Sequence, residues 1–236
     1  MAARRLFSTK DFIWLHVPKT GGTWLHQVLT KYAPESWEVC GGPPAHVRLY
    51  EVPTALEHWN RRPDRIGLPI IASVRNPWDW YVSLYFFLEQ HRVNRTGGYS
   101  LPKNQWQPGL AQWEERYGKG NNVRGFRAAM PRILEDMHVK AVMGIANPQT
   151  YFVRDPYGSV GVRAVRFEGL RKNMLEALEA VGAEVSPTLR DQLTNSPKAN
   201  TSGHAKYTAC YDDATRKLVA RHEAWMIDRF GYRFGD

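Results

Sequence analysis

Cysteines are few and long hydrophobic runs are missing from this sequence, and each scarcity excludes a class of protein. The 236 residues include two cysteines, Cys40 and Cys210, which are too few for a disulfide framework and lack the spacing of a metal site. We expect two reduced thiols, with a single bridge between them as the alternative. No apolar run approaches the roughly 20 residues needed to cross a bilayer, so we expect no membrane span. The N-terminal segment also lacks a clean apolar stretch followed by a small-residue cleavage site, which favours a cytoplasmic protein.

Acidic residues are scarce relative to basic ones. Asp and Glu number 23 against 32 Lys and Arg, which gives a formal net charge of +9. This balance favours anionic partners such as nucleotides, sulfated or acidic glycans, nucleic acid or an acidic membrane surface. Charge alone does not choose among these partners.

The length of the chain predicts one α/β domain over residues 1–236. An irregular insertion interrupts it at about residues 92–125, where glycine and proline break up polar and aromatic residues. A segment of this length without periodicity is usually functional or disordered. Two interpretations stay open, namely a lid on the substrate side and a mobile loop packed by its own aromatic residues.

The stretch FIWLHVPKTGGTW, residues 12–24, predicts a strand, a glycine turn and a helix in succession. Its apolar start is rich in β-branched and aromatic residues, as a buried strand would be. Pro18 ends the strand, the glycine pair that follows allows a tight turn, and Thr23 is placed to cap the helix. A helix N-terminus directs unpaired N–H groups and its positive dipole end toward a bound anion. This stretch therefore predicts an anion-binding loop.

The position of the lysine in this loop limits which class of anion the loop can be expected to bind. Lys19 precedes the two glycines, whereas an ATP-binding Walker loop reads GxxxxGK[ST] and places its lysine after them. Lys19 supplies a positive charge, and the hydroxyls of Thr20 and Thr23 supply further donors. An ordinary ATP-binding loop is therefore a poor match, and a plain strand-to-helix turn with a surface lysine is the bland alternative.

A second strand and helix bring another cation to the same predicted edge. Residues 68–74 read as a strand, Arg75 follows at its end, and Pro77 suits the first turn of a helix. Ligands of open α/β sheets bind beyond the carboxyl ends of the strands. Ser83 lies eight positions after Arg75, about two helical turns, so its hydroxyl can face the same anion. An arginine offers a planar fork for phosphate oxygens, and a serine adds a neutral donor.

The strings PKTGGTW and RNPWDWYVSLY together resemble two motifs of sulfotransferases that use 3′-phosphoadenosine-5′-phosphosulfate (PAPS) as donor. The first resembles the loop that holds the 5′-phosphosulfate, and in the second an arginine and a serine at this separation, here Arg75 and Ser83, grip the 3′-phosphate. The residues that the first motif would supply are Lys19, Thr20, Gly21, Gly22 and Thr23. The resemblance implies an α/β domain with a mostly parallel central sheet flanked by helices, the P-loop-NTPase-like sulfotransferase fold.

Two further stretches, PQTYFV and RFEGL, resemble the glycan-type sulfotransferases more than the cytosolic phenol and steroid branch. In related folds an aromatic residue near the second motif lies by the adenine, which here would be Phe167, with Trp24 as another stacking partner. Core packing is the alternative for both rings. The C-terminal part also resembles the family in its polar segment 195–206 and its terminal FGYRF. Residues of that segment that would close over the nucleotide phosphates are Lys198, Ser202 and Lys206.

The resemblance implies transfer of a sulfuryl group from PAPS to an acceptor hydroxyl, with 3′-phosphoadenosine-5′-phosphate (PAP) as product. His46 lies where many sulfotransferases carry the histidine base, and an imidazole pKa near 6.5 suits that role. His16, within the first strand, is its main rival. Lys19 would stabilise the charge that develops on the departing oxygen. No metal is required and the sequence offers no convincing metal-binding group.

The acceptor is not named by the sequence, which leaves a small molecule or a saccharide, and the oligomeric state is equally open. We expect no specific nucleic-acid partner. Two other functions are weighed. A P-loop nucleotide kinase would depend on Mg²⁺, and the order of lysine and glycines argues against it. A non-catalytic binder of anionic glycan or nucleic acid fits the net charge of +9 and would bind polymers in a strongly salt-dependent way.

Overall fold

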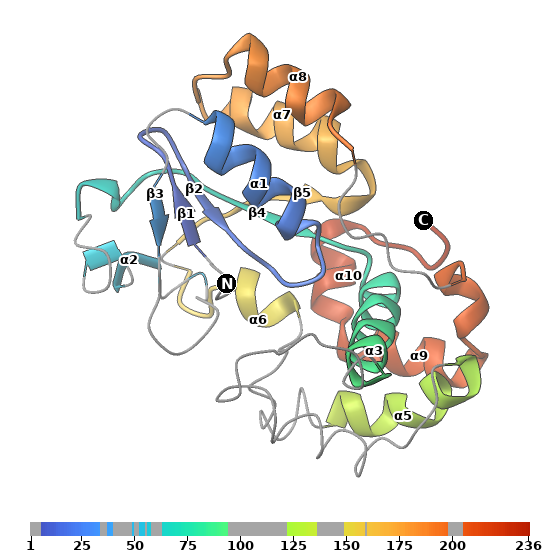
Figure 1. Cartoon of the computed structure of the whole chain (residues 1–236). Coiled ribbons are helices and arrows are strands. Elements are labelled where there is room, and N and C mark those ends of the chain that lie inside the picture. Colours follow the sequence, from blue (N-terminus) through green and yellow to red (C-terminus); the bar gives the residue numbers. More distant parts are fainter. Residues whose placement is uncertain are drawn as a thin grey trace. The chain divides into compact units, whose positions relative to one another are not determined.

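The computed structural model describes two compact units, whose elements are labelled in Figure 1. Unit 1 comprises residues 1–75 and 149–201, unit 2 comprises residues 76–148 and 202–236, and each has its own hydrophobic core. The described residues are 6–33, 37–39, 49, 52–54, 56–57, 63–93, 122–135, 149–158, 160–197 and 205–236. Within these ranges, every helix is too short or too polar to cross a membrane.

A five-stranded sheet of order β3-β1-β2-β4-β5 forms the centre of unit 1. Its strands are β1 Leu6–Ser8, β2 Ile13–Leu15, β3 Trp37–Val39, β4 Ile70–Val74 and β5 Arg163–Arg166. The neighbours β2, β4 and β5 are parallel, whereas β1 is antiparallel to both β2 and β3. Four strands therefore run in one direction, and the predicted α/β class with a central sheet and flanking helices is confirmed. The strands predicted at 12–17 and 68–74 are present as β2 and β4. The alternating segment VRAVRF, residues 162–167, also predicts a strand, and β5 lies within it. The strands β1 and β3 were not predicted.

Helices lie beside the sheet of unit 1 (Figure 1), and several of them share a hydrophobic core with it. Its helical elements are α1 Gly22–Tyr32, α2 Val52–Thr54, η3 Pro63–Arg65, α6 Gln149–Val153, η6 Phe167–Gly169, α7 Leu170–Ala180 and α8 Pro187–Asn195. The sheet contributes Trp14, Ile71 and Val165 to the core, and Leu25 and Met174 pack from α1 and α7. Apolar residues recur at helical spacing in both helices, so one face of each is buried. The segment NPQTYFV, residues 147–153, reads in the sequence as a turn leading into an apolar run. Its residues 149–153 form the helix α6 instead.

Unit 2 is built from helices around an aromatic core. Its elements are α3 Pro77–Val93, α5 Val123–Glu135, η7 Tyr207–Cys210, α9 Asp213–His222 and α10 Ala224–Phe230. Pro77 starts α3 as predicted. The predicted insertion at 92–125 lies mostly outside the described residues, and its described ends continue α3 and begin α5. The two interpretations of this insertion, a lid or a mobile loop, therefore stay predictions.

The apolar spacing of residues 212–230 predicts one C-terminal helix, and this prediction is wrong, because the structure divides the segment at Glu223. Glu223 leaves the helical conformation at φ −104° and ψ 19° and is buried at 2% exposure. Its carboxylate accepts a hydrogen bond from the Tyr81 hydroxyl at 2.7 Å. Burial and this carboxylate raise the pKa of Tyr81 well above its usual value. A buried carboxylate needs such a donor, and Tyr81 supplies it at the residue where the helix is interrupted.

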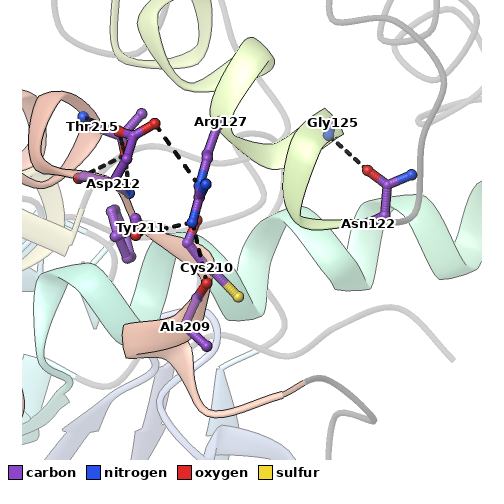
Figure 2. A network of polar contacts seen from close by, with 8 residues as sticks. All are labelled: Asn122, Gly125, Arg127, Ala209, Cys210, Tyr211, Asp212 and Thr215. Atoms are coloured by element: carbon purple, nitrogen blue, oxygen red, sulfur yellow. Dashed lines mark hydrogen bonds and ion pairs between the residues drawn. The ribbon is translucent and has the colours of Figure 1, made fainter.

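Arg127 of α5 joins that helix to the end of η7, as Figure 2 shows. Its Nε donates to the carbonyl oxygen of Cys210 at 2.9 Å, and Nη2 donates to that of Tyr211 at 3.1 Å. Nη2 also approaches the Ala209 carbonyl at 3.4 Å, and Nε forms an ion pair with Asp212 at 3.9 Å. One guanidinium therefore satisfies carbonyl groups at a helix end that the helix itself leaves open.

The start of α1 differs from the prediction in one respect. Thr23 does not cap the helix, because α1 begins at Gly22 and its N-cap is Gly21, two residues before the predicted cap. Gly21 is in the left-handed conformation at φ +83°. A left-handed residue is inexpensive only for glycine. Gly21 provides no side-chain cap, and Thr23 lies exposed within the first turn. The helix therefore presents its first N–H groups without a side-chain cap, as an anion site requires.

Gly22 lies against the imidazole of His16. A Cβ added at Gly22 would lie 2.0 Å from His16 Nε2 and 2.1 Å from its Cδ2, far inside van der Waals contact. The imidazole in turn stacks on Trp14, with ring centroids 5.4 Å apart. Gly22 therefore lets α1 begin in close contact with His16, the residue that follows β2.

Replacing Gly22 with alanine tests this close packing. We expect Gly22→Ala to lower Tm by about 3–10 °C, because overpacking of this kind costs about 1–3 kcal/mol. Gly161→Ala is the matched control, since a Cβ at Gly161 meets nothing within 4 Å. In a His16→Ala background the cost of Gly22→Ala should largely disappear. An equal loss of Tm with and without His16, measured by differential scanning fluorimetry, would contradict the assigned contact.

Candidate anion-binding site

Three predicted site residues follow the carboxyl ends of three neighbouring parallel strands in unit 1. Lys19 lies in the loop after β2, Arg75 comes directly after β4, and Phe167 comes directly after β5. Because parallel neighbours end at the same edge of a sheet, the topology brings the three together. This edge is where an open α/β sheet binds its ligand.

Arg75 contacts the loop through the backbone of Lys19. Its Nη1 donates a hydrogen bond to the Lys19 carbonyl oxygen at 3.1 Å. Lys19 has φ +63°, and it is the only non-glycine residue with positive φ in the described part of the chain. A left-handed lysine costs energy and persists only where its surroundings hold it. The guanidinium is one of the groups that hold it.

The two positive charges repel one another. Burial, and next the positive charge of Arg75, lower the pKa of the Lys19 ammonium from 10.5 to about 8. Each cause disfavours the charged amine. An anion bound beside both groups would reverse this effect, because it would compensate the two charges together. The electrostatics of the loop are therefore those of an anion site.

Phe167 provides an apolar surface beside the guanidinium. The Arg75 Cζ atom lies 4.5 Å from the centroid of the Phe167 ring, which is cation–π geometry. A Cβ added at Gly21 would lie 3.3 Å from Phe167 Cε2, so the ring also lies against the turn. Phe167 thus contacts both the predicted phosphate-binding loop and the predicted phosphate-binding arginine.

The Thr20 hydroxyl ties the loop to β4 and lies inside the protein. Its Oγ1 donates to the Val17 carbonyl oxygen at 2.7 Å and lies 2.7 Å from Ser73 Oγ. Because the single hydroxyl proton goes to Val17, Ser73 donates to Thr20. Thr20 has no exposed surface, so its side chain fixes the loop, whereas the exposed Thr23 hydroxyl lies at the start of α1.

Gln149 is a site residue that the sequence interpretation missed. Its Oε1 accepts a hydrogen bond from the Arg75 backbone N–H at 2.7 Å, and its Nε2 donates to the Arg75 carbonyl oxygen at 2.8 Å. The motif PQTYFV contained a signal, because Gln149 is its only residue with a carboxamide, which can pair with a backbone N–H and a backbone carbonyl group at once.

Trp24 is packed inside unit 1. Its Nε1 donates to Ser196 Oγ at 2.8 Å, and the Arg171 Cζ atom lies 5.1 Å from the ring centroid. The side chain is 6% exposed. Arg171 also donates to the carbonyl oxygens of Leu193, Thr194 and Ser196 at the end of α8. This environment is that of a packing residue, and stacking of adenine on Trp24 stays a prediction.

Of the remaining predicted site residues, two lie in unit 2 and three lie outside the described residues, so their place beside this group stays a prediction. Ser83 lies on α3 in unit 2 and is buried at 1% exposure, and Lys206 is an exposed residue of unit 2. His46, Lys198 and Ser202 lie outside the described residues. Among the residues that the structure describes, no group of three His, Cys, Asp or Glu side chains is arranged to hold a metal ion.

Known proteins provide a weak structural match and no sequence match. No protein-family model and no curated protein sequence matches the chain. Among solved structures, mouse sulfotransferase SULT7A1 complexed with PAP aligns with 96% of this chain and 86% of its own, at 14% identity and a TM-score of 0.42. These values do not assign the chain to a family, so its function has to be inferred from the residues of the site.

Proposed function

We propose that this protein is a sulfotransferase that moves a sulfuryl group from PAPS to an acceptor hydroxyl. The observation that carries the proposal is the contact of Arg75 with the Lys19 backbone beside the start of α1. Two cations and a helix N-terminus without a side-chain cap converge there, and the lysine precedes the glycines as in PAPS-binding loops. Such a site suits a donor that carries several negative charges.

The residues of the loop would act on the phosphosulfate end of the donor. The first N–H groups of α1 donate to its oxygens, and Lys19 lies closest to the bond that breaks. The acceptor oxygen attacks sulfur, the S–O bond to the 5′-phosphate breaks, and its electron pair goes to the phosphate oxygen. Lys19 stabilises the charge that develops on that oxygen. The acceptor proton goes to a base, for which His46 stays the proposed residue.

Arg75 would bind the phosphate at the other end of the donor, on the 3′ position. Its guanidinium lies on the Phe167 ring, which places an apolar surface where the nucleoside would lie between two anionic ends. Ser83 is proposed as its partner, and Lys198, Ser202 and Lys206 as residues that close over the phosphates. Thr20 supports the loop by its buried hydroxyl.

The finer assignments belong to the same proposal. The motifs favour the glycan-type branch. The proposed acceptor is a saccharide or a small molecule, PAP is the second product, and the reaction uses no metal. We also propose a cytoplasmic location and a single sulfotransferase domain over residues 1–236. None of these is needed for the chemistry at Lys19.

Removal of the Arg75 guanidinium should weaken PAP binding. We expect Arg75→Ala to raise the Kd for PAP by about 10- to 100-fold, because a charge-assisted contact to phosphate is lost. Arg190→Ala is the matched control, since Arg190 is exposed on α8 and pairs with Glu179. Titration calorimetry with PAP measures the Kd of the wild type and of both variants. Equal PAP affinity in Arg75→Ala and the wild type would contradict the assignment of Arg75.

The lowered pKa of Lys19 predicts a pH dependence of binding. Below about pH 8 the free protein already carries a charged Lys19, so binding needs no proton at this residue. Above that pH the amine must take up a proton when the anion binds, and the Kd for PAP should rise toward a limit of about tenfold per pH unit. Calorimetry between pH 7 and 9.5, in buffers of different ionisation enthalpy, measures both the Kd and the proton uptake.

Lys19→Arg is the control for this dependence, because a guanidinium stays charged over the whole range. The variant should bind PAP without the rise above pH 8 and without proton uptake. A wild-type pH profile in Lys19→Arg would show that another group titrates, and it would remove Lys19 from the anion site.

A further inference from the structure

Arg75 lies at the point where the sheet stops providing hydrogen-bond partners. The β4–β5 ladder runs from Ile71↔Arg163 to Val74↔Arg166, and Arg75 is the next residue of the chain. Arg75 is 7% exposed, so its backbone N–H and carbonyl groups are shielded from water. A buried backbone group without a partner costs free energy comparable to a lost hydrogen bond. Arg75 therefore depends on a partner from outside the sheet.

Gln149 supplies that partner with one side chain. Its carboxamide accepts from the Arg75 N–H at 2.7 Å and donates to the Arg75 carbonyl oxygen at 2.8 Å. A neighbouring strand would offer the same pair of groups. A carboxamide presents a donor and an acceptor side by side on one planar group, and glutamine carries this group one methylene further from the backbone than asparagine does. The side chain thus continues the ladder by one residue.

The carboxamide is itself held in place. Gln149 is 2% exposed and begins α6, a short helix whose Phe152 and Val153 are also buried. A buried glutamine anchored in this way has little freedom to turn. Its two hydrogen bonds consequently fix the direction in which the Arg75 side chain leaves the backbone.

We propose that Gln149 is a positioning residue that aims the Arg75 guanidinium and thereby makes the site selective for nucleotides with a second phosphate. The proposal rests on the proposed function and adds a determinant of donor specificity. From the backbone that Gln149 fixes, the guanidinium reaches the Phe167 ring and the Lys19 carbonyl oxygen. A shift of the Arg75 backbone would displace both contacts, whereas the loop N–H groups at α1 would remain.

The test compares PAP with adenosine 5′-monophosphate (AMP), which lacks the 3′-phosphate. We expect Gln149→Leu to raise the Kd for PAP by about tenfold or more, as for a misplaced charged contact, and to change the Kd for AMP by less than about twofold. Gln27→Leu is the matched control, because Gln27 is exposed on α1. In the Arg75→Ala background Gln149→Leu should have no further effect on PAP, since the two residues act through one guanidinium.

Gln149→Glu provides a second measurement that does not depend on the stability of the leucine variant. An ionised glutamate has no donor for the Arg75 carbonyl oxygen, whereas the protonated acid has one donor and one acceptor. Burial at this position raises the pKa of a glutamate carboxyl group, so the ratio of the variant Kd for PAP to the wild-type Kd should be high at pH 7.5 and decrease as the pH is lowered to 5.5. Gln27→Glu should show a ratio near one at both pH values.

The outcomes separate this inference from the proposed function. A wild-type protein that binds PAP no better than AMP would overturn the proposed function and the inference together. A wild-type preference for PAP that persists in both Gln149 variants would overturn only the inference. Equal losses of PAP and AMP binding would also overturn it, because Gln149 would then support the whole unit and not the arginine.

Discussion

The repulsion between Lys19 and Arg75 is the constraint on which the site depends. Two cations meet at the ends of β2 and β4, where burial and Arg75 lower the pKa of Lys19 to about 8. Unit 1 uses several groups to keep them there. Arg75 holds the left-handed Lys19 by its carbonyl, and Gln149 holds the Arg75 backbone. A protein that keeps two charges together in this way gains most when a ligand with several negative charges binds beside them and compensates both.

Local sequence patterns predicted the elements that carry the site but not all of their details. The run 12–17 and the apolar spacing after it sufficed for β2 and α1, and Pro77 sufficed for the start of α3. The strands β1 and β3 have three residues each and, unlike β2, do not lie in a longer apolar run, so no sequence signal marks them. The expected cap at Thr23 failed because Gly21 takes the left-handed conformation, and propensity does not fix which glycine of a pair does so. The residue at the helix break, Glu223, is hydrogen-bonded to a tyrosine 142 positions earlier in the chain, which no local pattern records.

Within the site, the sequence predicted which residues bear charge but not what orients them. Lys19 and Arg75 were found because each follows a strand in a recognisable string. Their contact spans 56 positions, and the partner of Arg75 lies 74 positions further along the chain, which no local pattern records. Residue type also does not show which neighbours an aromatic ring has. Trp24 and Phe167 were both predicted to stack on adenine, which stays a prediction; the Trp24 ring lies beside Arg171 and the Phe167 ring beside Arg75.

Transfer of labelled sulfate from PAPS tests the central claim most directly. The assay presents saccharide, phenol, steroid and amine acceptors to the wild-type protein and to Lys19→Met, without added metal. The account predicts transfer to at least one acceptor class, with turnover reduced by about a hundredfold or more in Lys19→Met and a much smaller change in donor affinity. Turnover that is unchanged in Lys19→Met, or binding of PAP without transfer to any acceptor class, would contradict it.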